Sequence, residues 1–117
     1  MIGTMCKTLQ IFIEDTDMWE GERLADAIVH LLHKRGIAGA TVCSGIMGFG
    51  AAGRIHRKGL FGITDEKPMI ITAIDSEERL RGIVPEILPM IKEGLVAMFD
   101  TEVFVAGMES ANSPTSD

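Results

Sequence analysis

The chain has 117 residues, 46% of them hydrophobic, which is enough for one domain with an ordinary buried core. Aromatic residues make up only 5% of the chain and tyrosine is absent, so the sequence lacks the rings on which single-stranded nucleic acids stack. Eleven basic residues against seventeen acidic ones give a net charge of −6, the wrong sign for a protein that binds nucleic acid. We therefore expect no nucleic-acid partner.

The two cysteines, Cys6 and Cys43, lie in apolar stretches and show no metal-ligand spacing. We interpret them as buried free thiols of a protein kept in a reducing compartment. The N-terminus has no cleavable apolar segment, and no apolar run reaches the length needed to span a membrane. These features predict a cytoplasmic protein.

The first part of the chain predicts a strand, a helix and a second strand. Hydrophobic and polar residues alternate over residues 7–14, which is typical of a strand. Residues 15–17 offer helix caps, and residues 20–35 carry an apolar stripe at helical spacing. Gly36 follows, where a helix commonly ends in the left-handed conformation. Residues 41–47 predict a second, shorter strand.

The middle of the chain is rich in glycine, since six of the thirteen glycines lie between residues 45 and 62. Residues 69–75 (MIITAID) then predict a third strand. Ser76 is placed to cap a second helix, which we expect to run to about residue 93 with a bend at Pro85.

The last strand pieces, residues 95–98 and 102–106, complete a β-α-β-β-α-β order. This order predicts an α+β domain of the ferredoxin-like class, with a four-stranded antiparallel sheet and two helices on one face. The domain should cover residues 1–107. The polar tail, residues 108–117, is rich in turn formers and should be disordered.

Both faces of the predicted sheet are apolar. Residues 69–75 and 102–106 carry hydrophobic side chains that point both ways, whereas a sheet with helices on one face normally has a solvated second face. The sequence predicts no third helix to cover that second face. We therefore expect another copy of the same sheet to cover it.

A glycine motif at residues 48–53 matches the G-x-G-x-x-G pattern of dinucleotide-binding sites, and Asp75 lies where the ribose-binding acid of such a site would be. That kind of site needs a helix that begins at the third glycine. Residues 54–68 carry no apolar stripe and two further glycines, and the chain is too short for a doubly wound sheet. We therefore reject a Rossmann site.

Asp26, His30 and His33 share one face of the first predicted helix, at a spacing that also suits metal ligands. This face lies opposite the apolar stripe, so we interpret it as a solvated polar face and assign no metal site. The sequence shows no set of base, nucleophile or metal ligands typical of catalysis. We predict that the chain is not an enzyme.

Several motifs resemble those of the nitrogen regulatory protein PII. The stretch GIAGATV at residues 36–42, followed by GFG at 48–50, is similar to the PII pattern of a glycine-containing turn, Thr-Val and Gly-Phe-Gly. The resemblance is closer still to a PII-like branch, the domain-of-unknown-function family one-ninety, over nearly the whole chain. The motifs shared with that family are GATV at 39–42, GFGA at 48–51, Ile55-His56, Pro68 before the third strand, DSEE at 75–78 and EGLV at 93–96.

The resemblance implies a homotrimer with nucleotide-sized clefts between its subunits. Carried over to this chain, the PII ligand site comprises Thr41 and the backbone of Gly48, Phe49 and Gly50. Glycines suit such a site because they let backbone N–H groups approach phosphate oxygens closely. The effector implied is an adenine nucleotide: ATP, ADP or AMP.

The chain departs from the PII pattern in three places, the first of which is a spacing between Thr41 and Gly48 that is one residue longer. Alanines at 51–52 stand where PII has Arg-Gln, and residues 98–101 contain no lysine where PII has a Gly-Asp-Gly-Lys turn. Arg54, His56 and Arg57 belong to the one basic cluster of this acidic chain, and we take them as further candidates for ligand contacts. The alternative for this cluster is a charged, solvated loop.

The functional hypothesis is a PII-like signalling protein that senses a small ligand at its subunit clefts. It would report through a loop at residues 51–67 to a partner such as a membrane transport protein. That loop shows no sustained hydrophobic period, so we expect it to be the most mobile part of the domain and to lack internal structure. The first alternative is a trimeric metal-binding or metal-tolerance protein of the same fold that uses His30, His33, His56 or Cys43, and the second is an enzyme that acts on nucleotides.

Overall fold

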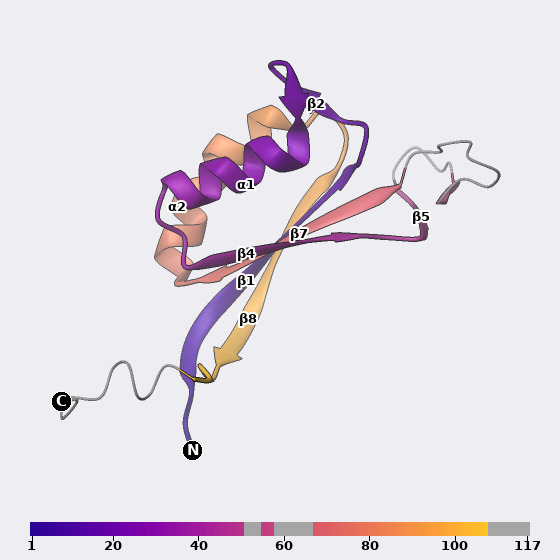
Figure 1. Ribbon diagram of the computed structural model, residues 1–117. Helices are drawn as coiled ribbons and strands as arrows, with labels where there is room; N and C mark the ends of the chain where they lie inside the picture. The colour runs from indigo at the N-terminus through magenta and orange to yellow at the C-terminus, as the bar shows by residue number, and fades with distance from the viewer. Residues whose placement is uncertain (51–54, 58–66, 108–117) are drawn as a thin grey trace.

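A four-stranded antiparallel sheet with two helices on one face forms the centre of the structure (Figure 1). The computed structural model describes residues 1–50, 55–57 and 67–107. The strand order is β4-β7-β1-β8, and these elements are β1 (Thr4–Glu14), α1 (Leu24–Lys34), β4 (Gly39–Ser44), β7 (Pro68–Asp75), α2 (Glu77–Ile87) and β8 (Leu95–Val103). The predicted α+β, ferredoxin-like class is confirmed.

Short elements complete the described part of the chain. β2 (Met18–Trp19) and β3 (Glu22–Arg23) form a small hairpin before α1, and β5 (Met47–Phe49) and β6 (Ile55–Arg57) form a second hairpin between β4 and β7. η1 (Leu88–Met90) is a 3-10 turn that follows α2. Across these described ranges, no helix is long and apolar enough to span a membrane.

The core lies between the helices and the face of the sheet that they cover. On β1 the predicted alternation holds, with Leu9 and Ile11 fully buried, and the neighbouring strand β7 adds Ile71 and Ala73 to the same face. The helices contribute Leu24, Ala25, Ala27, Ile28 and Leu32 from α1 and Leu80, Ile83 and Ile87 from α2. Each large aliphatic side chain buried in this way stabilises the fold by roughly 1.5–3 kcal/mol.

The other face of the sheet, here called the open face, is covered by none of the described elements. Strand register places its side chains in rows across the sheet. The rows are Cys43, Ile70, Phe12 and Leu95; then Thr41, Thr72, Gln10 and Ala97; then Gly39, Ile74, Thr8 and Phe99. Leu95 is 56% exposed and Phe99 46%. The second face is therefore largely apolar, as the sequence predicts, but a polar row crosses it.

The first helix begins four residues later than predicted, at Leu24 rather than residue 20. The residues before it form the β2–β3 hairpin, whose turn has Glu20 at φ 47° and Gly21 at φ 88°. The prediction is wrong here because a non-glycine residue occupies the left-handed region, which sequence gives no reason to expect. The predicted left-handed Gly36 at the end of the helix is confirmed, with φ 78°.

The predicted caps at residues 15–17 do not cap α1. The N-cap residue is Arg23, and its side chain makes no capping hydrogen bond. Asp17 instead fixes the chain around the small hairpin. Its carboxylate accepts the Glu14 N–H at 3.0 Å, and its carbonyl accepts the Leu24 N–H at 2.8 Å.

The second helix begins as predicted and ends early. Ser76 caps it, since its hydroxyl accepts the Arg79 N–H at 3.2 Å. Pro85 lies inside the helix, but the helix ends at Ile87 and continues only as η1, short of the predicted residue 93. Pro89 within η1 explains this end, because proline has no N–H with which to extend the α-helical hydrogen-bond pattern.

The last strand is continuous rather than divided into two pieces. β8 pairs with β1 along its whole length, from Leu95 opposite Phe12 to Val103 opposite Thr4. β8 ends at Val103, three residues before the predicted end at residue 106, because its antiparallel partner β1 begins at Thr4. The continuous pairing makes β8 a long edge strand beside α2.

The predicted burial of both cysteines is wrong for Cys43. This residue is exposed on the edge strand β4, beside Ile70 in the first row of the open face, and Cys6 on β1 is partly exposed. The hydrophobic sequence neighbours of Cys43 suggested that it is buried, but every residue of β4 is exposed in the single chain.

Gly94 lies where the chain passes closest to β1 before entering β8. A Cβ atom at this position would meet the Phe12 carbonyl oxygen well inside van der Waals contact and would lie 3.1 Å from Ile91 Cγ2. We expect Gly94→Ala to lower the free energy of unfolding by about 1–3 kcal/mol, because the backbone must shift to relieve the overlap. Urea denaturation measures this change.

Gly82→Ala is the matched control for that experiment. Gly82 lies inside α2, and nothing lies within 4 Å of the position its Cβ would take. Alanine should therefore raise the free energy of unfolding by about 0.5–1 kcal/mol through its higher helix propensity. Equal effects of the two substitutions would contradict the close approach of residue 94 to β1.

Candidate functional site

The second hairpin projects from the end of the sheet where β4 stops and β7 begins (Figure 1). Its two strands pair with Met47 opposite Arg57, Gly48 opposite His56 and Phe49 opposite Ile55. Most of the candidate ligand residues of the sequence lie on these strands or beside them. The hairpin and its base are therefore the candidate functional site.

Gly45 and Pro68 fix the base of the hairpin on the β4 side. The Gly45 N–H donates to the Pro68 carbonyl at 2.7 Å, and a Cβ atom at Gly45 would lie 2.7 Å from Pro68 Cγ. A side chain at residue 45 would therefore displace the proline. A Cβ atom at Gly48 would lie 3.5 Å from the same ring, which is ordinary contact. Gly45 and Gly48, two of the clustered glycines, thus both lie next to the Pro68 ring.

Asp15 fixes the base on the β7 side. Its N–H donates to the Lys67 carbonyl at 2.9 Å, its carboxylate accepts the Lys67 N–H at 3.0 Å, and the Lys67 ammonium lies 3.9 Å from that carboxylate. The sequence pattern indicates a helix cap at Asp15 and does not reveal this second role, since an acidic residue after a strand fits either. Both ends of the segment between Gly45 and Lys67 are therefore fastened to the sheet.

The candidate ligand residues fall into two groups. Gly48 and Phe49 lie on β5, opposite the β6 backbone at residues 56 and 55, and Gly50 directly follows β5. Thr41 is separate from them, on the open face of β4, where it pairs with Thr72. The structure brings the glycine strand and β6 together but does not join them to Thr41 within one subunit.

The basic candidates are only partly described. Arg54 lies outside the described residues, as do the side chains of His56 and Arg57, whose backbone belongs to β6. The prediction that residues 51–67 lack internal structure is wrong at 55–57, because these residues form a strand. A three-residue strand is too short for hydrophobic alternation to reveal it. The rest of that segment, apart from Lys67, lies outside the described residues.

The described part of the hairpin offers backbone and apolar groups. Nothing lies within 4 Å of the position that a Gly50 Cβ would take, so the backbone there is accessible. Ile46 is 79% exposed and Phe49 is 74% exposed. Residues 45–50 contain no titratable side chain. This surface has the chemistry to bind an anion through N–H groups and a flat ring through Phe49, and its described side chains offer no acid, base or nucleophile.

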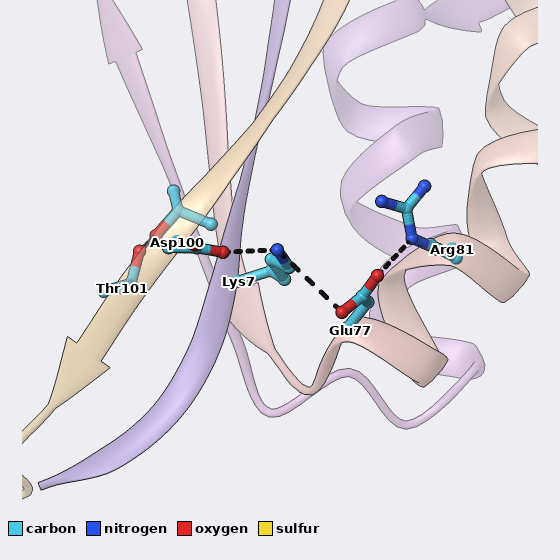
Figure 2. Close-up of polar contacts among 6 residues, drawn as sticks. Lys7, Glu77, Arg81, Asp100 and Thr101 are labelled. Carbon is cyan, nitrogen blue, oxygen red and sulfur yellow. Dashed lines mark hydrogen bonds and ion pairs between the residues drawn. The ribbon is translucent and has the colours of Figure 1, made fainter.

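A cluster of charged side chains lies near the other end of the sheet (Figure 2). Lys7 of β1 forms an ion pair with Asp100, its opposite residue on β8, and its ammonium lies 3.8 Å from the Glu77 carboxylate of α2. Arg81 donates from Nε to that same carboxylate at 2.6 Å. The cluster thus links two strands of the sheet to the first turns of α2.

The charges in this cluster are balanced. The hydrogen bond between Lys7 and Asp100 lowers the pKa of the Asp100 carboxyl and raises the pKa of the Lys7 ammonium. The pKa of Glu77 is lowered by its hydrogen bond from Arg81 and then by the charge of Lys7. All three pKa values move away from neutrality, opposite to what an acid or base catalyst needs. We interpret the cluster as a structural clamp that holds β1, β8 and α2 together. The sequence did not predict it, because Lys7 and Asp100 are 93 residues apart.

The histidines of α1 lie on its exposed side. His30 and His33 are both exposed, as is Asp26, and the His30 imidazole lies 3.6 Å from the Glu22 carboxylate. The interpretation of this face as a solvated polar face is therefore confirmed. Among the residues that the structure describes, no group of three His, Cys, Asp or Glu side chains is placed to hold a metal ion.

The sequence matches one family model along most of its length. Residues 6–103 match the DUF190 family, described as "Uncharacterized ACR, COG1993". The chain is similar to the UPF0166 protein of Methanocaldococcus jannaschii, with 34% identity over 84% of this chain and 91% of that protein. It is also similar to the UPF0166 protein of Aquifex aeolicus, with 31% identity over 83% of this chain and 91% of that protein.

Solved structures of related fold include CPII, a nitrogen regulatory PII-like protein from Thiomonas intermedia bound to ADP, AMP and bicarbonate. The TM-score is 0.66 and the identity 22%, over 86% of this chain and 89% of CPII. A putative PII-like signaling protein from Thermus thermophilus matches with a TM-score of 0.53 and 21% identity, over 94% and 98% of the two chains. The divalent ion tolerance protein CutA1 from Ehrlichia chaffeensis matches with a TM-score of 0.53 and 16% identity, over 86% and 83%.

These matches agree with the motifs and with the geometry. The family match spans every strand of the main sheet in whole or in part, and the relatives above 30% identity are covered over nearly their full length. The solved structures, at lower identity, share the fold. The chain therefore belongs to the DUF190 family and has the PII-like version of the ferredoxin-like fold.

Proposed function

We propose that this chain is a cytoplasmic regulatory protein that binds an adenine nucleotide at the clefts between the subunits of a homotrimer. Residues 51–67 report the bound state to a partner, for which a membrane transport protein is the candidate. The observation that carries the proposal is the anchored glycine hairpin, on a fold shared with a PII-like protein whose structure holds ADP and AMP. The protein acts by binding and not by catalysis.

The chemistry of the hairpin supports a nucleotide as the ligand. Backbone N–H groups at Gly48 and Gly50 suit phosphate oxygens, and the exposed Phe49 ring suits a base or an apolar partner surface. Arg54, His56 and Arg57 supply positive charge near a phosphate. Since alanines replace Arg-Gln at 51–52, AMP or ADP is favoured over the more highly charged ATP. Thr41 belongs to the proposed site through the resemblance to PII.

The open face supports the homotrimer. Leu95, Phe99 and Ile74 expose 56%, 46% and 37% of their surface there. No described element covers this face, and the apolar area would be removed from water if copies of the sheet packed against one another. Such an assembly also creates clefts between subunits in which a ligand can bind.

A metal-tolerance protein of the same fold is the second candidate, and the similarity to CutA1 favours it. His30, His33 and Cys43 do not lie together within the described residues, so a site would have to form between subunits or include His56. Thermal shift assays with nucleotides and divalent metals separate the two candidates, because each ligand raises the melting temperature only of a protein that binds it in the folded state.

Nucleotide binding tests the proposed site through Gly50→Glu. This change adds a side chain and a negative charge where the backbone is accessible. We expect AMP and ADP to bind at least about tenfold more weakly, because a charge-assisted hydrogen bond is worth about 1.5–3 kcal/mol. Isothermal titration calorimetry measures the affinity.

Gly82→Glu is the control for that titration. It adds the same charge at an open position of α2, far from the hairpin in the sequence and in the fold, and should leave the affinity unchanged. Equal affinity of the wild type and Gly50→Glu would mean that any nucleotide binds away from the hairpin.

Light scattering on a sizing column tests the homotrimer. Ile70 faces the open face, whereas its neighbour Ile71 is fully buried under the helices. We expect Ile70→Asp to give a folded protein of monomeric mass, and Ile71→Asp to unfold the domain, because an unpaired buried carboxylate is costly. A wild-type chain that elutes as a monomer at micromolar concentration would contradict the proposed assembly.

Hydrogen exchange tests whether residues 51–67 report the bound state. Peptides from this segment should exchange quickly without ligand and more slowly with AMP or ADP, since ordering of a segment protects its amides. Peptides from α1 serve as the internal reference and should not change. Exchange over 51–67 that is slow in the free protein and unaffected by ligand would leave the proposal without its output segment.

A further inference from the structure

A polar row crosses the centre of the open face, between two rows that carry most of its large apolar side chains. Gln10 of β1 lies in the middle of this row, with Thr72 of β7 on one side and Thr41 of β4 beyond it. Gln10 is the only glutamine in the chain, and it occupies one of the two inner strands of the sheet. A polar side chain at the centre of an otherwise apolar surface calls for a physical explanation.

The hydrogen-bonding capacity of this row is largely unused within the subunit. The Gln10 side chain has two N–H donors and a carbonyl acceptor. Among the described residues it makes one side-chain hydrogen bond, from Nε2 to the Thr72 hydroxyl, at a long 3.4 Å. Thr41, at the end of the row, is exposed on the edge strand. The side-chain amide of Gln10 therefore has one N–H donor and its carbonyl acceptor available for a partner outside the chain.

A second polar pair on the same face behaves differently. Thr8 and Thr101 join their hydroxyls in a short hydrogen bond, and Thr8 is only 4% exposed. This pair satisfies its polar atoms inside the subunit and gains nothing from a second copy. The Thr8–Thr101 pair therefore stabilises the folded chain itself, whereas the side chain of Gln10 remains available to a partner.

We propose that the row of Gln10, Thr72 and Thr41 selects how copies of the chain are placed against one another on the open face. This inference rests on the proposed homotrimer. When the face is buried, each polar group left without a partner costs about 1–3 kcal/mol. A slide by one row, about 6.8 Å along the strands, would set Gln10 against Phe12 and Ile70, or against Ile74 and Phe99. The placement in which polar rows meet is therefore favoured over its neighbours.

The apolar rows alone do not make this choice. Hydrophobic burial is non-directional, so side chains such as Phe12, Phe99 and Leu95 stabilise several placements by similar amounts. A buried polar group discriminates because it stabilises one placement and penalises the rest, which is the best-attested use of such groups in other assemblies. Removal of the polar row should therefore leave the copies associated but let them adopt more than one placement.

The test is the double substitution Gln10→Leu and Thr72→Val in the full chain. A spin label is attached at Asp26→Cys on the exposed side of α1, with Cys6→Ala and Cys43→Ala to remove the other thiols. A symmetric trimer places the three labels at equal distances, so pulsed electron resonance should give one narrow distance. We expect the double variant to remain associated by native mass spectrometry but to lose that single distance.

The control is Thr8→Val with Thr101→Val, which removes a polar pair from the same face and should keep the single distance. Loss of the single distance in both double variants, or in neither, would overturn the inference. If the double variant at 10 and 72 is insoluble, Gln10→Met alone removes the amide at similar volume and is judged by the same outcomes. A labelled parent protein that is monomeric refutes the homotrimer itself, whereas a trimeric parent with an unaffected double variant refutes only the role of the row.

Discussion

The alternation of side chains along β1 is the constraint on which the rest of the structure depends. β1 lies between β7 and β8, so its register determines which residues of both neighbours face the helices. Leu9 and Ile11 point into the core, and Gln10 and Phe12 point to the open face. A slip of one residue would exchange the two faces, burying Gln10 under the helices and exposing the core side chains. The strand thus determines the composition of the buried core and of the open face together.

Local signals in the sequence predicted the elements that form from local interactions. The alternation of β1, the apolar strand β7, the Ser76 cap and the left-handed Gly36 all depend on residues close in the chain, and all are confirmed. The β2–β3 hairpin was missed because Glu20 adopts a positive φ, and β6 because three residues show no period. In each case tertiary packing supplies what the local sequence does not specify.

The candidate site was predictable only in part. The glycines of β5 and the resemblance to PII located the candidate site, but neither the hairpin nor its anchors were predicted. Asp15 and Lys67 are 52 residues apart, and the clamp between Lys7 and Asp100 joins residues still farther apart. Such pairs become visible only when strand register is known. The hairpin and the clamp lie near opposite ends of β1, about 24 Å apart for a span of seven residues, so a substitution in one should leave the other unchanged.

The two anchors at the base of the hairpin also determine how it can move. Gly45 is held against Pro68, and Lys67 is held by Asp15, so both ends of the hairpin segment are attached to the neighbouring chain of the main sheet. If the hairpin moves relative to the sheet, its pivot must lie beyond these two anchors, and on the β4 side the first residue beyond the anchor is Ile46. A displacement of the exposed Phe49 about that pivot would leave the strand pairs of the four-stranded sheet unbroken. The two anchors would therefore confine any displacement of Phe49 to the hairpin and keep it out of the four-stranded sheet.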